Sequence, residues 1–432
     1  MMENQSKMQC DKPIPAGYKL TEVGIIPEDW FVEPLTIITE PKRPISYGIV
    51  QTGPSVINGV PCIRVVDISN GKIQTDNLIT TSEKISASYR RTILKKGDIV
   101  IPLRGKVGEI AIVDKYTHGA NLTRGVALIS LKKEYDSRYV RQYLSCKDSA
   151  DRFLASMNGS ALQEITIATL RRFPLARPNS LKEQIVIGKV LSDTDALITE
   201  LEQLITKKHA IKTATMQQLL SGRTRLTQFT KESDGSLKGY KSSELGDIPE
   251  DWELEKIGSL LSITTGGKNT QDKIADGNYP FFVRSQTVEK INSFSFDCEG
   301  VLTAGDGVGT GKIFHYINGK FDFHQRVYLM FNFSDRLDGY FFYIFFSNNF
   351  YDRIMSMTAK SSVDSVRREM IADMVMLLPP KAEQIAIASI LFDMDSELTA
   401  LEQKLAKIRD IKQGMMQQLL TGRIRLPLEQ QP

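Results

Sequence analysis

Apolar residues in two stretches of the chain recur in alternating steps of three and four. The spacing is the heptad pattern of a coiled coil, and a second apolar row widens the stripe of the first stretch so that it could touch more than one neighbour. We therefore predict two helices, at residues 183–221 and 383–421, each about 55 to 60 Å long. The predicted seam residues are Leu191, Ile198, Leu201, Ile205 and Leu219 in the first helix, with the second row at Val190, Leu197, Leu204 and Ile211, and Leu391, Met394, Leu398, Leu401, Leu405, Ile408, Met415 and Leu419 in the second, where Lys412 interrupts the row.

Both predicted helices belong to a segment that occurs twice. Residues 183–226 return without a gap as residues 383–426, and a shorter opening, GYKLTEVGIIPEDW at 17–30, returns as GYKSSELGDIPEDW at 239–252. Since a whole domain separates the helices in sequence, we expect them to pack on each other in antiparallel orientation. The alternative is that each helix only caps its own domain. Gly222 and Gly422 follow the helices, where a left-handed C-terminal cap is expected.

The segments between the repeats share almost no sequence. Each contains short β-branched runs separated by turns, then a predicted helix and a strand ending in proline. The runs are 60–68, 97–102, 109–113 and 125–131 in the first segment and 279–284, 312–317 and 326–333 in the second, and the helices are 137–157 and 337–357. Repeated flanking segments around divergent domains indicate that the chain performs one task twice for the same partner, while the two domains recognise two different targets.

The predicted fold class is α+β, with two strand-rich α+β domains separated by two long antiparallel coiled-coil helices in a pseudo-two-fold cyclic arrangement. The tail repeats the start of the linker, so we expect it to lead back to the first domain and the termini to lie near one another. The predicted boundaries are a first domain at 1–180, a helix at 181–222, a polar linker at 223–246, a second domain at 247–380, a helix at 381–422 and a tail at 423–432.

Composition narrows the class of protein only a little. The chain has 432 residues, of which 41% are hydrophobic and 25% charged, so it can form two to four domains with proper cores. A net charge of +4 is compatible with nucleic-acid binding but does not indicate it by itself. No apolar run reaches the roughly 20 residues of a membrane span, and the N-terminus lacks an apolar signal core, so we expect a cytoplasmic protein.

Motifs for catalysis or metal binding do not emerge. The segment AGDGVGTGK at 304–312 has one residue too many between Gly305 and Gly311 for a P-loop, and Ile313 follows the lysine where Ser or Thr is needed. We interpret it as a tight hairpin whose glycines allow close backbone approach. The segment LRGKVG at 103–108 has a similar alternation of glycine and basic residues. The four cysteines form no CxxC pair and the four histidines lack metal-ligand spacing. We predict no catalytic and no metal site in this chain.

The two GYKxxxxGxIPEDW openings, two variable domains and two helices of the form EQxxI…LEQ…MQQLL(S/T)GRxRL resemble the specificity subunit of Type I restriction-modification systems. The resemblance covers essentially the whole chain. It implies two target recognition domains that each read half of a split, asymmetric site on double-stranded DNA. It also implies that the helices set the spacer and carry two methyltransferase subunits, which use S-adenosylmethionine, and that two motor-nuclease subunits using ATP and magnesium join the complex. This chain itself would be non-catalytic and hold no cofactor.

Polar, glycine-punctuated loops are the expected DNA-contacting segments. Arg or Lys can read guanine and Asn or Gln can read adenine in the major groove, while phosphate contacts set the register. Each candidate could equally be a solvated surface side chain. The candidates are Tyr47, Gln51, Arg64, Arg90, Arg91, Arg104, Lys106 and Arg124 in the first domain and Lys268, Asn269, Arg284, Lys312, His324, Gln325, Arg326 and Lys360 in the second.

Three alternatives stay open from sequence. The chain could be a stand-alone nuclease or methyltransferase, which would need a cofactor or metal motif that it lacks. It could be a purely structural coiled-coil scaffold, which would leave the divergence of the two domains unexplained. Within the family it resembles, it could serve a complex that cuts on both sides of its site or one that only methylates.

Overall fold

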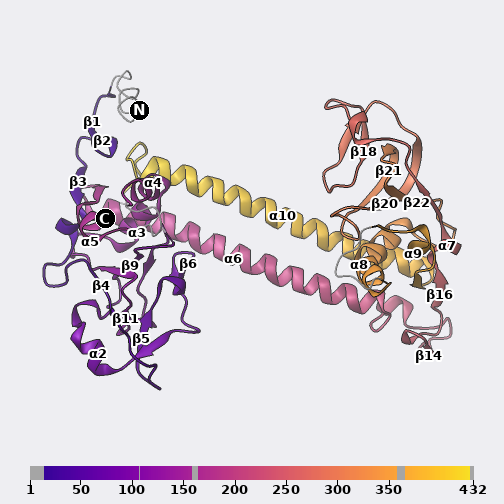
Figure 1. Cartoon of the computed structure of the whole chain (residues 1–432), viewed down its shortest axis with the longest axis horizontal. Coiled ribbons are helices and arrows are strands. Elements are labelled where there is room, and N and C mark those ends of the chain that lie inside the picture. The colour runs from indigo at the N-terminus through magenta and orange to yellow at the C-terminus, as the bar shows by residue number, and fades with distance from the viewer. Residues whose placement is uncertain (1–13, 107, 158–163, 358–364, 429–432) are drawn as a thin grey trace. The chain divides into compact units, whose positions relative to one another are not determined.

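The computed structural model describes residues 14–428 except 107, 158–163 and 358–364. The chain forms two compact units, residues 1–202 with 403–432 and residues 203–402 (Figure 1). The long helices α6 (Leu181–Leu220) and α10 (Lys381–Leu419) each contribute one half to each unit. None of the helices in the described part of the chain is long and apolar enough to span a membrane.

The first unit is built around an antiparallel four-stranded sheet and a smaller three-stranded sheet. The four-stranded order is β10 (Ala111–Ile112), β9 (Ile99–Pro102), β12 (Val126–Ile129) and β4 (Ser46–Tyr47), and the three-stranded order is β11 (Asn121–Leu122), β5 (Val60–Ile63) and β8 (Ile79–Thr81). Further strands pair two by two beside these sheets: β1 (Tyr18–Thr21) with β2 (Gly24–Pro27), β3 (Phe31–Pro34) with β13 (Pro174–Arg177), and β6 (Ile68–Ser69) with β7 (Lys72–Ile73). The shorter helices of this unit are α1 (Leu35–Ile38), α2 (Glu83–Ser88), α3 (Ser137–Ser145), α4 (Lys147–Ala155) and α5 (Ile167–Arg172).

The second unit has one larger sheet. Its strand order is β17 (Ser262–Thr265), β22 (Val327–Phe331), β20 (Phe296–Ala304), β21 (Phe314–Phe323), β18 (Tyr279–Phe282) and β19 (Glu289–Ile291). The remaining elements are the hairpin β14 (Tyr240–Ser243) and β15 (Gly246–Pro249), the pair β16 (Glu253–Lys256) and β23 (Val375–Leu378), and helices α7 (Ile257–Leu260), α8 (Gly339–Met357) and α9 (Arg368–Ala372).

The two sheets share one topology despite their different sequences. The order β4, β12, β9, β10 in the first unit corresponds to β17, β22, β20, β21 in the second, with antiparallel pairing throughout. In each unit one strand then pairs in parallel, β5 with β11 and β18 with β21, and carries an antiparallel edge strand, β8 or β19. The long strand β21 therefore takes the place of both β10 and β11.

Two details of the sequence prediction are wrong. The single helix predicted at 137–157 is two helices, because Cys146 adopts an extended conformation that ends α3 and starts α4. The strand predicted at 60–68 ends at Ile63, since Asp67 accepts a hydrogen bond from the backbone of Arg64 and closes a 3-10 turn at residues 65–67.

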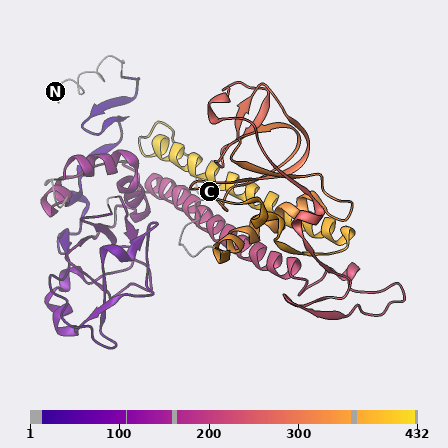
Figure 2. The ribbon, with the colours of Figure 1, turned by 45° about the vertical axis from the view of Figure 1, so that its right-hand side comes forward.

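The halves of α6 and α10 pack in antiparallel orientation within each unit (Figure 2). In the first unit Lys412 bonds Asp195 at 2.6 Å and Arg409 bonds Glu202 at 2.5 Å; in the second, Lys208 reaches Glu397 at 2.7 Å and Lys212 pairs with Asp395. Partners therefore run in opposite directions along the two helices, which confirms the predicted pairing.

Burial along the helices follows the predicted seam. The leucines of the seam are buried except Leu401, which is partly buried like the Ile and Met positions. Lys412, which interrupts the seam of the second helix, pairs with Asp195 of the facing helix, and its repeat counterpart Lys212 pairs with Asp395. The second predicted row behaves differently, because Leu197, Leu204 and Ile211 are each about two-fifths exposed at 41%, 39% and 41%. Within the part of the chain that the structure describes, no neighbour covers those side chains fully.

Each domain core extends onto the helix ends. Trp30 is fully buried in a cluster that includes Leu191 and Leu420, and Trp252 is fully buried in a cluster that includes Leu220 and Leu391. Both tryptophans come from the repeated PEDW opening and directly precede a strand, β3 in the first unit and β16 in the second. The repeat thus anchors each domain on the helix pair of its own unit.

The segments that follow the two helices are folded against the domains. Gly222 and Gly422 have φ angles of +70° and +68°, which confirms the left-handed caps. Within the segment predicted as a polar linker, Arg225 is only 3% exposed and bonds Glu383 and Asp251. In the tail, the Gly422 carbonyl accepts a hydrogen bond from the Tyr18 hydroxyl at 3.2 Å, so the described parts of the two ends meet as predicted, while residues 1–13 and 429–432 lie outside the described residues.

Candidate nucleic-acid interface

Loops at one end of the second sheet bring six predicted residues together. The Gln325 amide N–H donates to the Lys268 carbonyl at 2.9 Å, and Gln325 Nε2 donates to Asn269 Oδ1 at 2.7 Å. His324 and Arg326 flank Gln325, and Arg284 follows β18, which pairs with β21 in parallel. The fold therefore gathers Lys268, Asn269, Arg284, His324, Gln325 and Arg326 at the start of β22 and the ends of β17, β18 and β21.

Asp306 lies in the middle of this group and is not among the predicted residues. Its Oδ1 accepts from Arg284 Nη1 at 2.7 Å and its Oδ2 accepts from Arg326 Nη1 at 3.2 Å. Nearby, Lys268 Nζ lies 3.9 Å from the buried carboxylate of Asp322. Burial lowers the pKa of His324, with a further lowering by Arg284, so its neutral ring can accept at Nδ1 from the Arg326 amide at 3.0 Å.

The glycine-rich segment 304–312 forms the hairpin loop between β20 and β21, as predicted. A Cβ added at Gly305 would lie 2.9 Å from the Arg326 carbonyl oxygen, so glycine allows the close backbone contact there. Of the two other predicted residues of this domain, Lys312 is not in the group. Lys312 Nζ lies 5.4 Å from the centroid of the Tyr351 ring, and Lys360 lies outside the described residues.

The first domain has an equivalent loop group with different residues. The Leu103 amide bonds the Gly125 carbonyl and Ile165 bonds Leu103, matching the bonds from Gly305 to Arg326 and from Val366 to Gly305 in the second domain. Isolated bridges agree, since Arg104 pairs with Glu164 as Asp306 pairs with Ser365. Arg104 therefore occupies the position of Asp306.

The other candidates of the first domain fall in several places. Arg124 is exposed beside Arg104, while Arg64 is held by Asp67 and Lys106 Nζ donates to the Ile68 carbonyl at 2.9 Å. Gln51 is an exposed loop residue, and Arg90 is exposed at the start of a 3-10 turn at residues 90–92.

Tyr47 and Arg91 line a pocket of about 310 Å³ in this domain. Arg171, which the sequence did not single out, also lines it and donates to the Ile45 carbonyl at 2.9 Å. It comes from α5, far from the loops in sequence, so only the fold reveals it.

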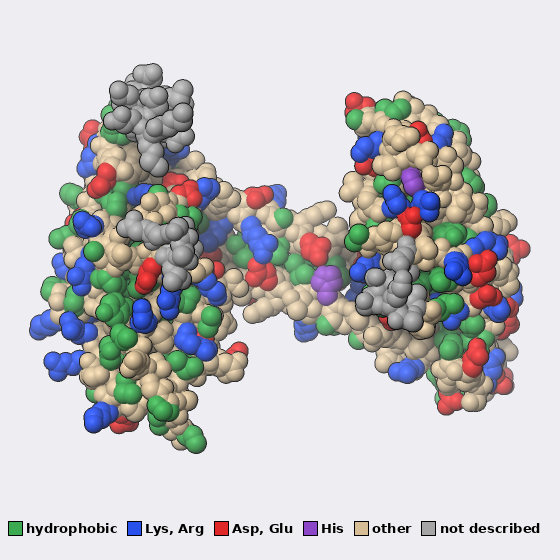
Figure 3. Space-filling model, viewed as in Figure 1, with side chains coloured by type: hydrophobic (Ala, Val, Ile, Leu, Met, Phe, Trp, Pro, Cys, Tyr) green, Lys and Arg blue, Asp and Glu red, His purple; other side chains and the backbone are tan. Residues whose placement is uncertain are grey.

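Charge on the surface is mixed. Lysine and arginine side chains are scattered over both units among apolar and acidic ones on the face shown in Figure 3. Among the described residues, no group of three or more His, Cys, Asp and Glu side chains is arranged to hold a metal ion. Of the histidines, His209 bonds Glu402 and His315 bonds the Ser285 carbonyl, while His118 is exposed.

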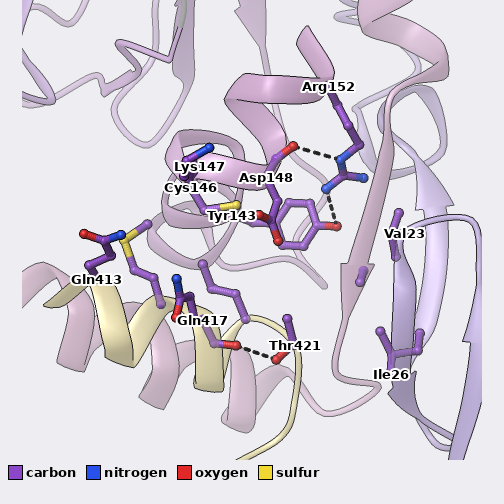
Figure 4. A pocket seen from close by; sticks show the side chains of 13 residues that line it. Val23, Ile26, Tyr143, Cys146, Lys147, Asp148, Arg152, Gln413, Gln417 and Thr421 are labelled. Atoms are coloured by element: carbon purple, nitrogen blue, oxygen red, sulfur yellow. Dashed lines mark hydrogen bonds between the residues drawn. The ribbon is translucent and has the colours of Figure 1, made fainter. Parts of the chain in front are cut away.

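A small crevice of about 70 Å³ lies where the end of α10 meets α3, α4 and the β1–β2 hairpin of the first unit. Figure 4 shows Arg152 turned toward Tyr143, whose hydroxyl accepts its hydrogen bond at 3.2 Å, with a second bond to the Asp148 carbonyl at 3.1 Å. Its guanidinium also lies 5.1 Å from the ring centroid of Phe173. The crevice is too small for a nucleotide and is part of the surface on which the end of α10 packs.

The family model of the Type I restriction modification DNA specificity domain matches this chain twice, at residues 55–213 and 249–410. The chain belongs to this family. The first match covers the first variable domain from residue 55 onward, the second covers the second variable domain, and each includes most of the helix that follows. The resemblance to Type I specificity subunits is thereby confirmed, and with it the fold class of two recognition domains and two long helices.

Specificity-domain relatives match over different lengths. The EcoBI specificity subunit of Escherichia coli is 28% identical over 58% of this chain and 52% of its own length, and the EcoDI subunit is 30% identical over 41% and 38%. The chain thus spans about half or less of those two relatives. The putative MjaX specificity subunit of Methanocaldococcus jannaschii is 25% identical over 95% of this chain and 97% of its own.

A solved structure of the S subunit of the Type I restriction-modification system from M. genitalium has the same fold. It superposes with a TM-score of 0.61 at 14% identity, covering 93% of this chain and 97% of that one. Identity this low supports the fold and nothing finer.

Proposed function

We propose that this chain is the sequence-reading subunit of a Type I restriction-modification complex, in which each domain reads one half of a bipartite, asymmetric DNA target. The observation that carries the proposal is the equivalence of the two loop groups. The same topology presents Arg104 and Arg124 in one domain and Asp306, Gln325 and Arg326 in the other. Different donors and acceptors on one scaffold read different bases, so the half-sites differ.

The helix pair is proposed to set the spacer and to bind two methyltransferase subunits. The exposed apolar side chains along it support this role, namely Ile185 and Leu197 in the first unit and Leu204, Ile211, Ile385 and Phe392 in the second. Apolar side chains in a row on a helix mark an interaction surface. In this proposal the chain is non-catalytic: the partners bind S-adenosylmethionine and methylate adenine, and two motor-nuclease subunits that use ATP and magnesium complete the cytoplasmic complex.

Mapping of methylated adenines tests the function directly. The chain is expressed with the methyltransferase subunits encoded beside it, in a host that lacks other adenine methylation. A split, asymmetric methylated motif is expected, whereas a palindromic motif or no methylation would contradict the proposal. Recovery of DNA cleavage on both sides of the motif, or of methylation alone, would identify the kind of complex.

Arg104→Ala and Arg326→Ala separate the two readers. Each variant should weaken binding to duplexes that match only its own half-site and leave the other half-site unchanged, because the two residues belong to different domains. Unchanged affinity and footprints for both variants would remove these residues from the interface.

Leu204→Glu and Ile211→Glu test the docking surface. A buried carboxylate without a partner is costly, so both variants should reduce the methyltransferase that co-purifies with the chain. Ala210→Glu is the matched control, because Ala210 is exposed on the face of α6 opposite the seam. Equal recovery from all three variants would place the docking surface elsewhere.

A further inference from the structure

Asp306 places a negative charge at the centre of the basic loops of the second domain. Each carboxylate oxygen holds one arginine, Oδ1 the guanidinium of Arg284 and Oδ2 that of Arg326. The two arginine side chains are 43% and 63% exposed, whereas Asp306 is 19% exposed. The carboxylate therefore lies beneath two guanidinium groups that remain open to the outside.

The backbone around this triad is fixed as well. The Arg326 carbonyl accepts from the Gly305 amide at 2.8 Å, and the Arg326 amide donates to His324 Nδ1 at 3.0 Å. Both the N–H and the C=O of Arg326 are thus hydrogen-bonded, and the partner of the C=O is Gly305, the residue before Asp306. The carboxylate then limits the side-chain rotamers that Arg284 and Arg326 can adopt.

An acidic residue in a DNA-contacting loop repels phosphates, so its presence needs a compensating role. Holding an arginine in place is such a role, because a guanidinium reads guanine through two parallel hydrogen bonds to O6 and N7 and needs a defined orientation to do so. An ordered side chain also loses less conformational freedom when it binds. In the first domain the equivalent position is Arg104, a donor that can itself contact DNA.

We propose that Asp306 is a positioning residue that orients Arg284 and Arg326 for guanine readout, so that the second domain's half-site contains a guanine contacted by one of them. The inference rests on the proposed function. It predicts that Asp306 contributes to discrimination between sequences and not to general affinity for DNA.

The test uses the full chain co-purified with its methyltransferase subunits and duplexes that carry the mapped motif. Each G·C pair of the second half-site is replaced in turn by A·T. For the wild type, one replacement should weaken binding about 5- to 150-fold, the range for a bidentate base contact. In Asp306→Ala most of that ratio should be lost, while the affinity for the replaced duplex stays equal or rises because a negative charge is gone.

Three controls make the result specific. Asp276→Ala removes a carboxylate from an exposed loop of the same domain and should keep the wild-type ratio. Asp306→Asn, which keeps an acceptor for one arginine, should fall between wild type and Asp306→Ala. Replacements in the first half-site should cost the same in all variants, which shows that the complex is intact.

The outcomes separate the two proposals. If the wild-type complex methylates no split motif, the proposed function fails and this inference with it. If a split motif exists but the second half-site has no guanine, or if Asp306→Ala weakens all duplexes equally or discriminates like the wild type, only the positioning role is overturned.

Discussion

Replacement of Arg225 by alanine should strongly destabilise the second unit. Arg225 Nε and Nη2 bond the Glu383 carboxylate at 3.0 and 2.5 Å, and its Nη1 and Nη2 bond Asp251 at 2.8 and 3.0 Å. Trp252 Nε1 donates to the same carboxylate at 3.0 Å. The Glu383 side chain is fully buried, so without Arg225 its charge would be left, among the described residues, with the neutral indole donor of Trp252 alone.

The magnitude follows from burial. Removing one partner of a buried ion pair costs about 3 to 5 kcal/mol, because the remaining charge stays in a poorly solvated site. Burial by itself lowers the pKa of Arg225, but its bonds to Glu383 and Asp251 outweigh that effect and raise it. The arginine is therefore charged at every accessible pH.

The repeat supplies a matched variant in the first unit. Arg425 bonds Glu183 and Asp29 in the same arrangement, but its side chain is 45% exposed, and Trp30 Nε1 has no hydrogen-bond partner among the described residues. The Glu183 side chain is also buried, at 3% exposed, but water can reach the exposed site of Arg425 and solvate that carboxylate once the guanidinium is removed. Arg425→Ala should therefore cost only about 1 to 2 kcal/mol.

The two tryptophans of the chain allow each unit to be followed separately. Urea unfolding of Arg225→Ala is recorded by Trp252 fluorescence in a Trp30→Phe background, and that of Arg425→Ala by Trp30 fluorescence in a Trp252→Phe background. With an m value of about 2 kcal/mol/M, the midpoint should fall by about 1.5 to 2.5 M for Arg225→Ala and about 0.5 to 1 M for Arg425→Ala.

A double variant tests the cause. Adding Glu383→Gln to Arg225→Ala removes the stranded charge, so it should recover part of the lost stability. Equal midpoint shifts for the two single variants, or no recovery in the double variant, would show that burial of the Glu383 charge does not determine the loss.

Two further predictions concern stability. Gly222→Ala should lower the free energy of unfolding by at least about 1 to 2 kcal/mol, because the φ of +70° disfavours a side chain and the new Cβ would lie 2.6 Å from Pro249 Cδ. Gly414→Ala, in open space on α10, should raise it by about 0.5 to 1 kcal/mol. Urea midpoints measure both changes. Burial alone would raise the pKa of Asp195, but Arg141 and Lys412 lower it below 3.8, so its contribution to stability is present above the unfolded pKa of about 3.9 and is lost as the pH falls through the lower folded value. Asp195→Asn should therefore be less stable than the wild type at pH 7 and approach its stability in acid. The control Asp193→Asn breaks an exposed pair with Lys189 and should change the free energy of unfolding little at any pH.

The long helices could be predicted from sequence because their seam must be buried over many turns, and no other element satisfies that spacing. Strand β20 was missed, although it is the centre of the second sheet. Its sequence FDCEGVLTA mixes Asp297, Glu299 and Gly300 with apolar residues, and only pairing with β21 and β22 stabilises it as a strand. The break at Cys146 was also missed, since neither glycine nor proline marks it.

The candidate site could be predicted only as a set of cationic, amide and aromatic side chains without their acidic partner. Sequence composition identified Arg284 and Arg326, but their common partner Asp306 is acidic and lies in a loop chosen for its glycines. The group forms because β18 pairs in parallel with β21, a long-range contact that has no local signal. The same reasoning explains why Arg171 was not identified, since it reaches the pocket from α5.

The contacts between the repeated helices and the domains explain how the domain sequences can diverge while each domain stays packed on the helices. Gln184 and Gln384 are fully buried near the start of the long helices, and their Oε1 atoms accept from the backbone amides of Asp136 and Asp338 at 3.2 and 2.9 Å. Their Nε2 atoms donate to the carbonyls of Pro178 and Pro379 at 3.2 and 2.7 Å. In each bond the domain contributes a main-chain group, which every sequence possesses apart from the N–H that proline lacks. These two glutamines therefore bind each domain through its backbone, which leaves the side chains of the reading loops free to change.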